Sequence, residues 1–448
     1  MYQYESNRES HEYFHPSPTN NTRRASAKSS VFNLVSTIIG GGILSLPYAF
    51  SKCGLILAIV FMIITAATSG FSVYLLVSCS KRSGAQSYED VTYHAFGRTL
   101  QFVTMGLVIL LTFFSFVAYL ILTRDLASSL FNIHNEYERN ALTVCCLALI
   151  SPVLFFKTLH ALRFTSIFSL CTILILAIGI SIRAFEKMQS VSYQNASIQW
   201  WPKVWSDALY AFPIISVAFL CHFNVLPIHS ELHQPTRKRL KIIVYATMCS
   251  AWFFYMIVGI MGYLVSFTDK NGVPDDILII FKSNDVLINV WRCGLLMTVL
   301  LSLPLLLMPC RTTVFRFISE SRKVLHPVPE TIALLSKTTK IVHNTNEIPS
   351  TFMHITMTII LVLSALVVAF NIPGVSDVWS MLGSTVGILV SYVLPSISYI
   401  RIRKTKSNLD LRKFAAWIVF IASIIALCVC TVQAISNLRK LLRLHTPY

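Results

Sequence analysis

Apolar runs of membrane-spanning length recur along the whole chain and constrain its fold more than any other feature. Charged residues make up only 13% of the 448 residues. A helix needs about 20 apolar residues to cross a bilayer, and it must satisfy its backbone hydrogen bonds internally. The runs cover residues 30–51, 54–79, 99–123, 140–157, 163–183, 206–230, 241–267, 287–310, 350–370, 375–400 and 414–436. They predict an all-α multi-pass membrane protein with about 11 transmembrane helices.

The charge distribution indicates an orientation. The chain has 37 Lys and Arg residues against 20 Asp and Glu, a formal net charge of +17. About two thirds of these basic residues fall on the N-terminal side of the predicted membrane, and cytoplasmic loops are enriched in Lys and Arg. We therefore expect a cytoplasmic N-terminus and contact with membrane lipid. We expect no binding of nucleic acid, because no module for it is recognisable. The glycosylation sequon at Asn195 falls in a loop expected on the opposite face.

The polar segments define the domain organisation. Residues 1–28 contain no apolar signal-peptide core and are expected to form a disordered cytoplasmic tail. Residues 29–436 form one transmembrane domain, interrupted by a cytoplasmic connector over 311–349, and 437–448 form a short C-terminal tail. A short amphipathic helix at the membrane surface is expected within 81–98.

Three consecutive glycines interrupt the first run near its midpoint. Gly40, Gly41 and Gly42 are followed by Pro47, which lacks a backbone donor. One explanation is a close contact between two helices, for which small residues are typical. The polar residues nearby favour the other explanation, an unwound segment beside protein or a water-filled cavity.

The sixth run is irregular in a similar way, because two prolines flank the polar pair His222 and Asn224. The two interrupted runs occupy corresponding places in two five-run halves, 30–184 and 206–400. Matching interruptions are typical of the inverted repeats of secondary transporters. The sequence therefore predicts a five-plus-five inverted repeat with broken helices 1 and 6, and an eleventh helix outside it.

A broken helix exposes backbone groups that can bind charged ligands. Amides at the start of the second half-helix, near Gly41 and Ile43, can bind a carboxylate. Carbonyl oxygens at the end of the first half-helix can bind an amine or a cation. A small zwitterion suits both ends of the break. The predicted substrate-binding residues are Gly40, Gly41, Gly42, Ile43, Phe219, His222 and Asn224.

Several motifs occur together along the chain. They are Phe32-Asn33-Leu34, Ile39 through Pro47, Ser87-Tyr88-Glu89-Asp90, Ala95-Phe96-Gly97-Arg98, Phe219 through Ile228 with Glu231-Leu232, and Pro304 through Arg311. This combination resembles the amino acid/auxin permease family over about residues 29–436. The resemblance implies eleven helices in the inverted repeat and secondary active transport of small, neutral amino acids by alternating access. It is nearest to vacuolar transporters and sodium-coupled neutral amino acid transporters, so vacuolar or lysosomal and plasma membranes are both expected locations.

The resemblance also suggests a cation site, for which the candidates are Asn33, Ser36 and Ser302. Sodium-coupled members commonly carry Asn and Thr where this chain has Ser36 and Ser302. A serine hydroxyl can still ligate sodium, a hard ion that favours oxygen donors. His222 is a candidate for carrying a proton instead, since histidines within spans are often functional, although it can equally bond to backbone in the broken helix. Either Na⁺ or H⁺ is therefore the expected coupling ion, and no cofactor is expected.

Two charged groups outside the broken helices have plainer interpretations. Arg124 and Asp125 are expected to form a surface or gating pair at the end of the third run. Asp275, Asp276 and Asp285 make the 268–286 loop acidic, and we expect them to be solvated.

Other functions have weaker support. His229 and His233 have a spacing that a metal ion can share, but an interfacial helix end explains them more simply, and no metal site is expected. No nucleophile–base pair or paired carboxylates indicate an enzyme. The main alternative is an amino acid sensor that signals to cytoplasmic partners through residues 1–28 and 311–349.

Overall fold

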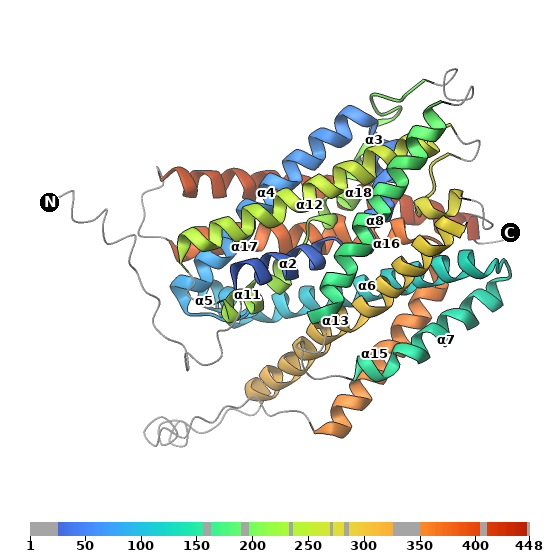
Figure 1. The fold of residues 1–448 in the computed structure, drawn as a ribbon. Coiled ribbons are helices and arrows are strands. Elements are labelled where there is room, and N and C mark those ends of the chain that lie inside the picture. Colours follow the sequence, from blue (N-terminus) through green and yellow to red (C-terminus); the bar gives the residue numbers. More distant parts are fainter. Residues whose placement is uncertain are drawn as a thin grey trace, which may run out of the picture.

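The computed structural model describes residues 26–155, 163–189, 197–232, 236–268, 272–281, 286–325, 350–403 and 410–445. All regular elements in these ranges are helices, and the long ones form a bundle whose members run between the same two ends (Figure 1). The first half contains α2 (Ala27–Ile38), the 3₁₀ helix η1 (Gly41–Ser45), α3 (Leu46–Cys53), α4 (Leu55–Ser83), α5 (Tyr88–Phe96), α6 (Arg98–Phe131), α7 (Glu136–Leu154) and α8 (Arg163–Met188).

The second half repeats this order of long and interrupted helices, and a last helix follows it. The second half contains α10 (Trp205–Ala218), α11 (His222–Glu231), α12 (Arg237–Ser266), the 3₁₀ helix η3 (Ile277–Ile280), α13 (Val286–Leu325), α15 (Thr351–Asn371), α16 (Val375–Leu382), the π-helices η4 (Gly383–Gly387) and η5 (Leu389–Val393), and α17 (Leu394–Ile402). The last helix is α18 (Leu411–His445).

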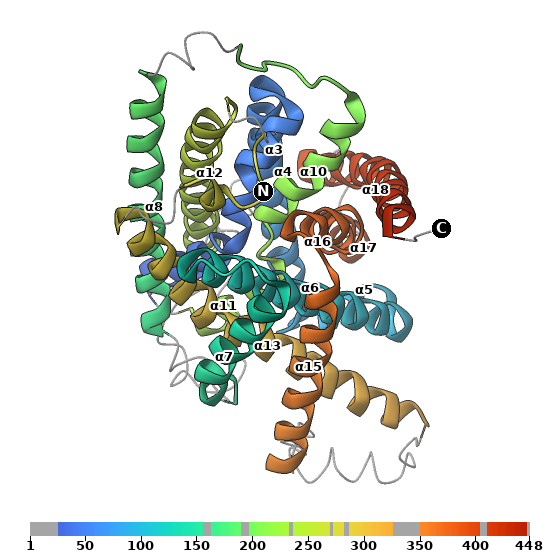
Figure 2. The same cartoon turned by 90° about the vertical axis from the view of Figure 1, so that its right-hand side faces the viewer.

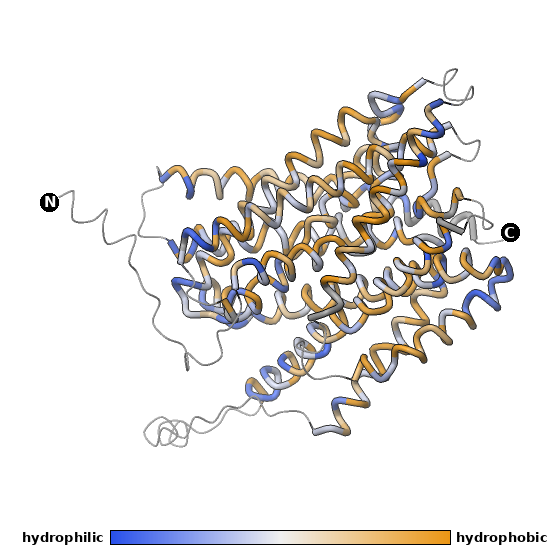
Figure 3. Tube along the Cα trace, viewed as in Figure 1, coloured by the Kyte–Doolittle hydropathy of each residue, from blue (hydrophilic) through white to orange (hydrophobic). Residues whose placement is uncertain are grey.

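Nine segments of the described chain are helical, long and apolar enough to cross a membrane. Two further expected runs complete the predicted set. The run 30–51 is the interrupted α2–η1–α3 segment, and the run 140–157 lies largely within α7, whose first turn is acidic. Figure 3 shows apolar residues along the helices and polar residues gathered at the two ends of the bundle.

The two predicted helix breaks are present. One separates α2 from α3, and the other separates α10 from α11, five spans later. The α16–α17 span lies deep in the bundle, with 72% of its apolar window buried, whereas only 11% of that of α18 is buried. Figure 2 shows α18 at the edge of the bundle beside α17, which agrees with an eleventh helix outside the repeat.

Successive long helices cross the bundle in opposite directions, so their ends alternate between its two ends. The start of α2, helix α5 and the ends of α13 and α17 lie at one end, and the ends of α3, α6 and α18 lie at the other (Figure 1). The short helix expected within 81–98 is α5, which Ser87 caps by accepting a hydrogen bond from the Asp90 amide. Asn195 of the sequon lies outside the described residues.

Helix α13 continues well beyond the run 287–310, as far as Leu325, so the first part of the expected connector is helical. Its polar residues find partners on neighbouring helices. The buried Arg311 donates to the Leu154 carbonyl at 3.1 Å and to the Thr358 hydroxyl at 2.7 Å. Arg316 pairs with Glu89 on α5. Hydropathy alone ended the span too early because these interhelical bonds compensate buried charge.

The π-helical segment between α16 and α17 was not predicted. A π-helix leaves backbone carbonyls out of the regular ladder, and such segments are common at functional sites. Here the Val390 carbonyl accepts from the Tyr88 hydroxyl at 2.6 Å, and the Ser391 carbonyl accepts from the Ser72 hydroxyl. Side chains of α4 and α5 thus satisfy carbonyls of the irregular span.

Candidate functional site

The backbone leaves the helical path at the two breaks. After α2, Ile39 leaves the helical conformation and Gly40 is extended, and η1 then starts a new helical segment at Gly41. After α10, residues 219–221 separate the two half-helices. Because α10 packs against η1 and α11 packs against α2, the two breaks are neighbours in the bundle.

Gly40 and Gly42 have different surroundings. An ideal Cβ on Gly40 would lie 1.7 Å from the hydroxyl oxygen of Tyr119 on α6, so any side chain there requires Tyr119 to shift. An ideal Cβ on Gly42 would meet no atom within 4 Å. Gly40 therefore lies in close contact with Tyr119, whereas Gly42 borders open space beside the break.

Tyr255 of α12 joins the two breaks. Its hydroxyl oxygen lies 2.6 Å from the Ile38 carbonyl oxygen and 2.8 Å from the Ala218 carbonyl oxygen. These carbonyls end the first half-helices α2 and α10, where no later amide of the same helix donates to them. The Ile38 carbonyl also accepts a hydrogen bond of 2.9 Å from the Gly40 amide in the break. Two C-terminal carbonyls thus converge on one fully buried hydroxyl group. The partial negative charge at helix C-termini makes this point suitable for a cation or an amine.

Phe219 lies beside this point. Its ring is fully buried and meets the Tyr255 ring edge-on, with centroids 5.2 Å apart. Its carbonyl accepts a hydrogen bond of 2.9 Å from the Ser69 hydroxyl of α4. At the second break, Ser69 of α4 therefore satisfies the Phe219 carbonyl, and the Tyr255 ring of α12 packs against the Phe219 ring.

His222 begins α11 and is fully buried. Neither of its ring nitrogens has a hydrogen-bond partner among the described residues. The alternative that it bonds to backbone in the broken helix is therefore wrong. A buried, unpaired imidazole costs free energy, which a ligand or a water molecule can recover. Asn224 follows at a half-buried position, and its backbone N–H donates to the Cys221 carbonyl at 3.0 Å.

The remaining predicted residues are only partly assembled. The Ile43 amide donates to the Gly40 carbonyl at 3.2 Å, so it is engaged within the break. The Ser302 hydroxyl donates to the Thr298 carbonyl of its own helix at 2.8 Å. Ser36 is half-buried on α2. For Asn33 and Gly41, the structure describes the backbone only.

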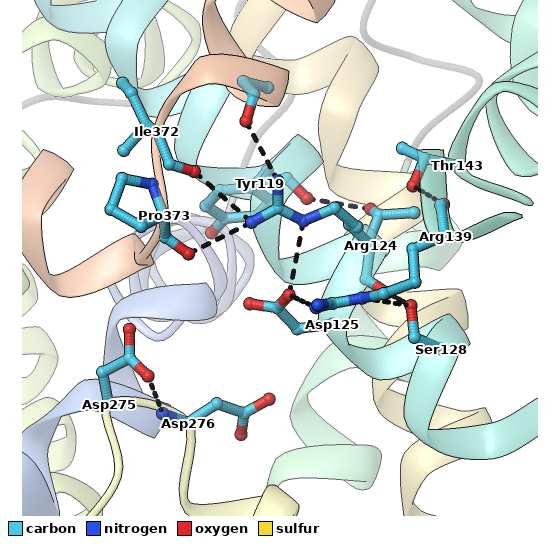
Figure 4. Close-up of polar contacts among 12 residues, drawn as sticks. Tyr119, Arg124, Asp125, Ser128, Arg139, Thr143, Asp275, Asp276, Ile372 and Pro373 are labelled. Atoms are coloured by element: carbon cyan, nitrogen blue, oxygen red, sulfur yellow. Dashed lines mark hydrogen bonds and ion pairs between the residues drawn. The ribbon is translucent and has the colours of Figure 1, made fainter. Parts of the chain in front are cut away.

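A network of buried charges lies at the end of the bundle where α6 ends (Figure 4). Arg124 donates to the carbonyls of Ile372 and Pro373, at 3.4 and 3.2 Å, between α15 and α16. Asp125 accepts a bond of 2.7 Å from Arg139 of α7. Both members of the Arg124–Asp125 pair are buried, so the surface interpretation is wrong, and the gating interpretation stays a prediction.

The sequence did not indicate the tyrosines of the site. Tyr119 and Tyr255 lie on apolar spans, and no spacing distinguishes them from lipid-facing aromatics. Among the described residues, no three His, Cys, Asp or Glu side chains form a group that can hold a metal ion. His233 of the alternative histidine pair lies outside those residues.

The paired breaks and the repeat are typical of secondary membrane transporters. The family model described as "Transmembrane amino acid transporter protein" matches residues 23–436. The chain belongs to this family, so the predicted resemblance is confirmed.

Comparisons with individual proteins agree. The chain is 24% identical over 423 residues to sodium-coupled neutral amino acid symporter 2 of Danio rerio, covering 88% of this chain and 78% of that protein. Its fold is similar to that of MhsT in complex with L-phenylalanine, with a TM-score of 0.59, 11% identity, and 92% and 99% of the two chains covered. It is also similar to Mhp1, a nucleobase-cation-symport-1 family transporter, with a TM-score of 0.57, 12% identity, and 94% and 93% covered. At these identities the two structures support the fold alone.

Proposed function

We propose that this amino acid transporter carries small neutral substrates, bound between the α2–α3 and α10–α11 breaks, in symport with Na⁺ or H⁺. The observation that carries the proposal is the convergence of the Ile38 and Ala218 carbonyls on Tyr255. The substrate ammonium group binds near these carbonyls, and the carboxylate binds the amides near Gly41 and Gly42. The residues of the two breaks, 39–40 and 219–221, have no charged side chain, which favours a substrate without side-chain charge.

The substrate side chain lies against the second break in this proposal. Phe219 provides an apolar wall, and His222 and Asn224 provide polar groups beside it. His222 supports a ligand here because its ring nitrogens have no partner within the described protein. The open space at Gly42 allows the substrate to approach the backbone closely.

We propose Na⁺ as the first coupling ion to test and H⁺ as the second. The similarity to a symporter named as sodium-coupled supports Na⁺. Asn33, Ser36 and Ser302 would then supply oxygen ligands, with Ser302 leaving its bond to Thr298. If Na⁺ is used, Ser36→Ala raises the Na⁺ concentration for half-maximal uptake. If H⁺ is used, Ser36→Ala leaves the ion dependence unchanged, and His222 is the group to replace.

The decisive experiment is uptake of labelled amino acids by the purified full-length chain in proteoliposomes. A panel of neutral, acidic and basic amino acids is offered under a Na⁺ gradient alone, under an H⁺ gradient alone, and without a gradient. We expect neutral amino acids to accumulate under one of the two gradients. Absence of accumulation under either gradient, from protein that is folded and binds an amino acid, would overturn the proposal and favour the sensor.

We propose a cytoplasmic N-terminus, supported by the excess of basic residues on that side. The plasma membrane and a vacuolar or lysosomal membrane both fit this orientation, and imaging of the tagged chain distinguishes them. The sensor alternative depends on residues 1–28 and 311–349, of which 1–25 and 326–349 lie outside the described residues.

A further inference from the structure

Asp276 lies in the connection between α12 and α13, at the end of the bundle opposite the start of α2. Its exposed fraction is only 1%. One carboxylate oxygen accepts a 2.9 Å hydrogen bond from the Leu278 amide and so caps η3. The other oxygen, Oδ2, is buried and has no hydrogen-bond partner among the described residues. The prediction that this loop aspartate is solvated is therefore wrong.

The charged groups around Asp276 compensate its negative charge only in part. The preceding residue, Asp275, accepts a hydrogen bond from the Asp276 amide at 3.1 Å. Figure 4 shows the Asp276 carboxyl group extending into the space beside Asp125 of α6. The nearby cation on α13, Arg292, is directed to the carbonyls of Leu278 and Phe281, at 2.8 and 2.7 Å. Arg292 thus binds carbonyls at the C-terminal end of η3, whereas the Asp276 carboxylate at the N-terminal start of η3 has acidic neighbours.

These surroundings favour the neutral acid. Burial is the largest of the effects that together raise the pKa of Asp276 from 3.8 to about 7. The charges of Asp125 and Asp275 act in the same direction as burial, whereas the hydrogen bond from Leu278 and the charge of Arg292 act against it. A protonated carboxyl group also gains an O–H donor for its unpaired side.

The same loop contacts the proposed substrate site. Helix η3 packs against η1, the segment that follows the first break, and against α6 and α12. Ile277 and Leu278 are fully buried in these contacts. A change in the charge of Asp276 therefore acts on an element that supports Gly41–Ser45 directly.

We propose that Asp276 is a proton-binding site that, when protonated, holds η3 against η1 and so keeps the substrate site closed toward that end of the bundle. The proton is taken from the solution on that face, and no other group is transferred. Loss of the proton leaves a buried negative charge beside Asp125 and Asp275. Moving Asp276 into water removes this cost and withdraws η3 from η1. Proton binding is argued from the buried, unpaired carboxyl oxygen of Asp276, whereas its effect on uptake rests on the proposed function.

The test compares wild type with Asp276→Asn, which keeps an oxygen to cap Leu278 and mimics the neutral acid. The first readout is the melting temperature of the purified full-length protein between about pH 4 and about pH 8. Because the folded-state pKa lies above the unfolded value, this carboxyl contributes stability that is full below about pH 4 and is lost as pH rises through about 7. We expect wild type to lose this contribution with rising pH and Asp276→Asn to keep it.

The second readout is uptake from the face that carries Asp276. The deprotonated fraction of a group with this pKa rises about tenfold between pH 6 and pH 8. We expect wild-type uptake to rise by up to that factor, and Asp276→Asn to remain at the low-pH rate throughout. The control is Asp275→Asn, which keeps Asp276 and is expected to keep the transition, shifted to lower pH.

Each outcome has a definite meaning. Identical pH dependence of melting in wild type and Asp276→Asn would overturn the proton site. A difference in melting without a difference in uptake would overturn the link to η1 and the substrate site. Loss of the transition in Asp275→Asn alone would assign the proton to Asp275 and overturn the proposal. Absence of uptake in all variants would count against the proposed transport function, while the melting curves would still decide the proton site.

Discussion

The hydroxyl oxygen of Tyr255 lies 2.6 Å from the carbonyl oxygen of Ile38, and it lies almost as close to that of Ala218. A hydroxyl group carries one hydrogen, so it donates fully to one carbonyl at a time or shares the hydrogen between both. Tyr255 is therefore the single side chain in the described structure seen to bond the C-terminal ends of both broken helices. The substrate amine proposed above would bind where this bonding is incomplete.

Replacing Tyr255 by Phe tests this relationship. Tyr255→Phe keeps the ring contact with Phe219 and removes the hydroxyl. The Ala218 carbonyl then loses this donor, and the Ile38 carbonyl keeps only the Gly40 amide. We expect a loss of about 1–3 kcal/mol of stability and a several-fold lower maximal uptake rate. Thermal unfolding and uptake kinetics measure the two effects. Tyr245→Phe, at an exposed position of the same helix, is the matched control and should change neither quantity.

Gly40 and Gly42 provide a second matched pair. A methyl group at Gly40 would collide with the Tyr119 hydroxyl, whereas one at Gly42 would meet nothing within 4 Å. We expect Gly40→Ala to lower both stability and uptake, because overpacking costs about 1–3 kcal/mol. Gly42→Ala should keep its melting temperature but raise the substrate concentration for half-maximal uptake, since it narrows the binding space. Equal melting temperatures for wild type and Gly40→Ala would show that Tyr119 moves aside easily.

Hydropathy and glycine spacing were sufficient to predict the main architecture. The long apolar runs gave the spans, and the position of Gly40–Gly42 relative to His222 gave the two breaks of the repeat. These features depend on short stretches of sequence, so a single chain reveals them. The end of α13 was placed too early because Arg311 and Arg316 find their partners on other helices.

The side chains that connect the site were not predictable in this way. Tyr255 and Tyr119 become important only because α12 and α6 bring them to the breaks. Asp276 has the composition of a solvated loop residue, and its burial depends on how η3 packs against η1. Interhelical distances of this kind have no local sequence signal, so the sequence did not single out these side chains.

Replacing His222 is expected to lower uptake without lowering the stability of the protein. The imidazole has no hydrogen-bond partner in the described protein, so replacing it by Phe removes an unsatisfied polar group without breaking a bond. We expect His222→Phe to be at least as stable as wild type while losing most of its uptake. His222→Gln, which restores donor and acceptor groups, should recover part of the uptake. A His222→Phe variant with normal uptake would remove this residue from the proposed site.

The ion pair between Glu89 of α5 and Arg316 of α13 gives the last prediction. Its atoms Oε1 and Nη1 are 2.5 Å apart, and the Glu89 side chain is only 8% exposed, whereas that of Arg316 is 42% exposed. Removing the arginine leaves a buried carboxylate unpaired, but removing the carboxylate leaves an arginine that water can solvate. We therefore expect Arg316→Gln to cost more stability than Glu89→Gln, by about 1–2 kcal/mol.

An exposed ion pair provides the comparison for these two stability losses, because breaking a surface pair costs little whichever partner is removed. Lys323 and Glu320 form an exposed pair on the same helix, and Lys323→Gln should cost less than about 0.5 kcal/mol. Chemical denaturation of all three variants measures these differences. If Arg316→Gln is as mild as Lys323→Gln, Glu89 reaches water when its partner is lost, and the pair does not fix α5 to the extended end of α13. If it is severe, the first part of the expected connector belongs to the folded domain, since its charge is needed to bury Glu89.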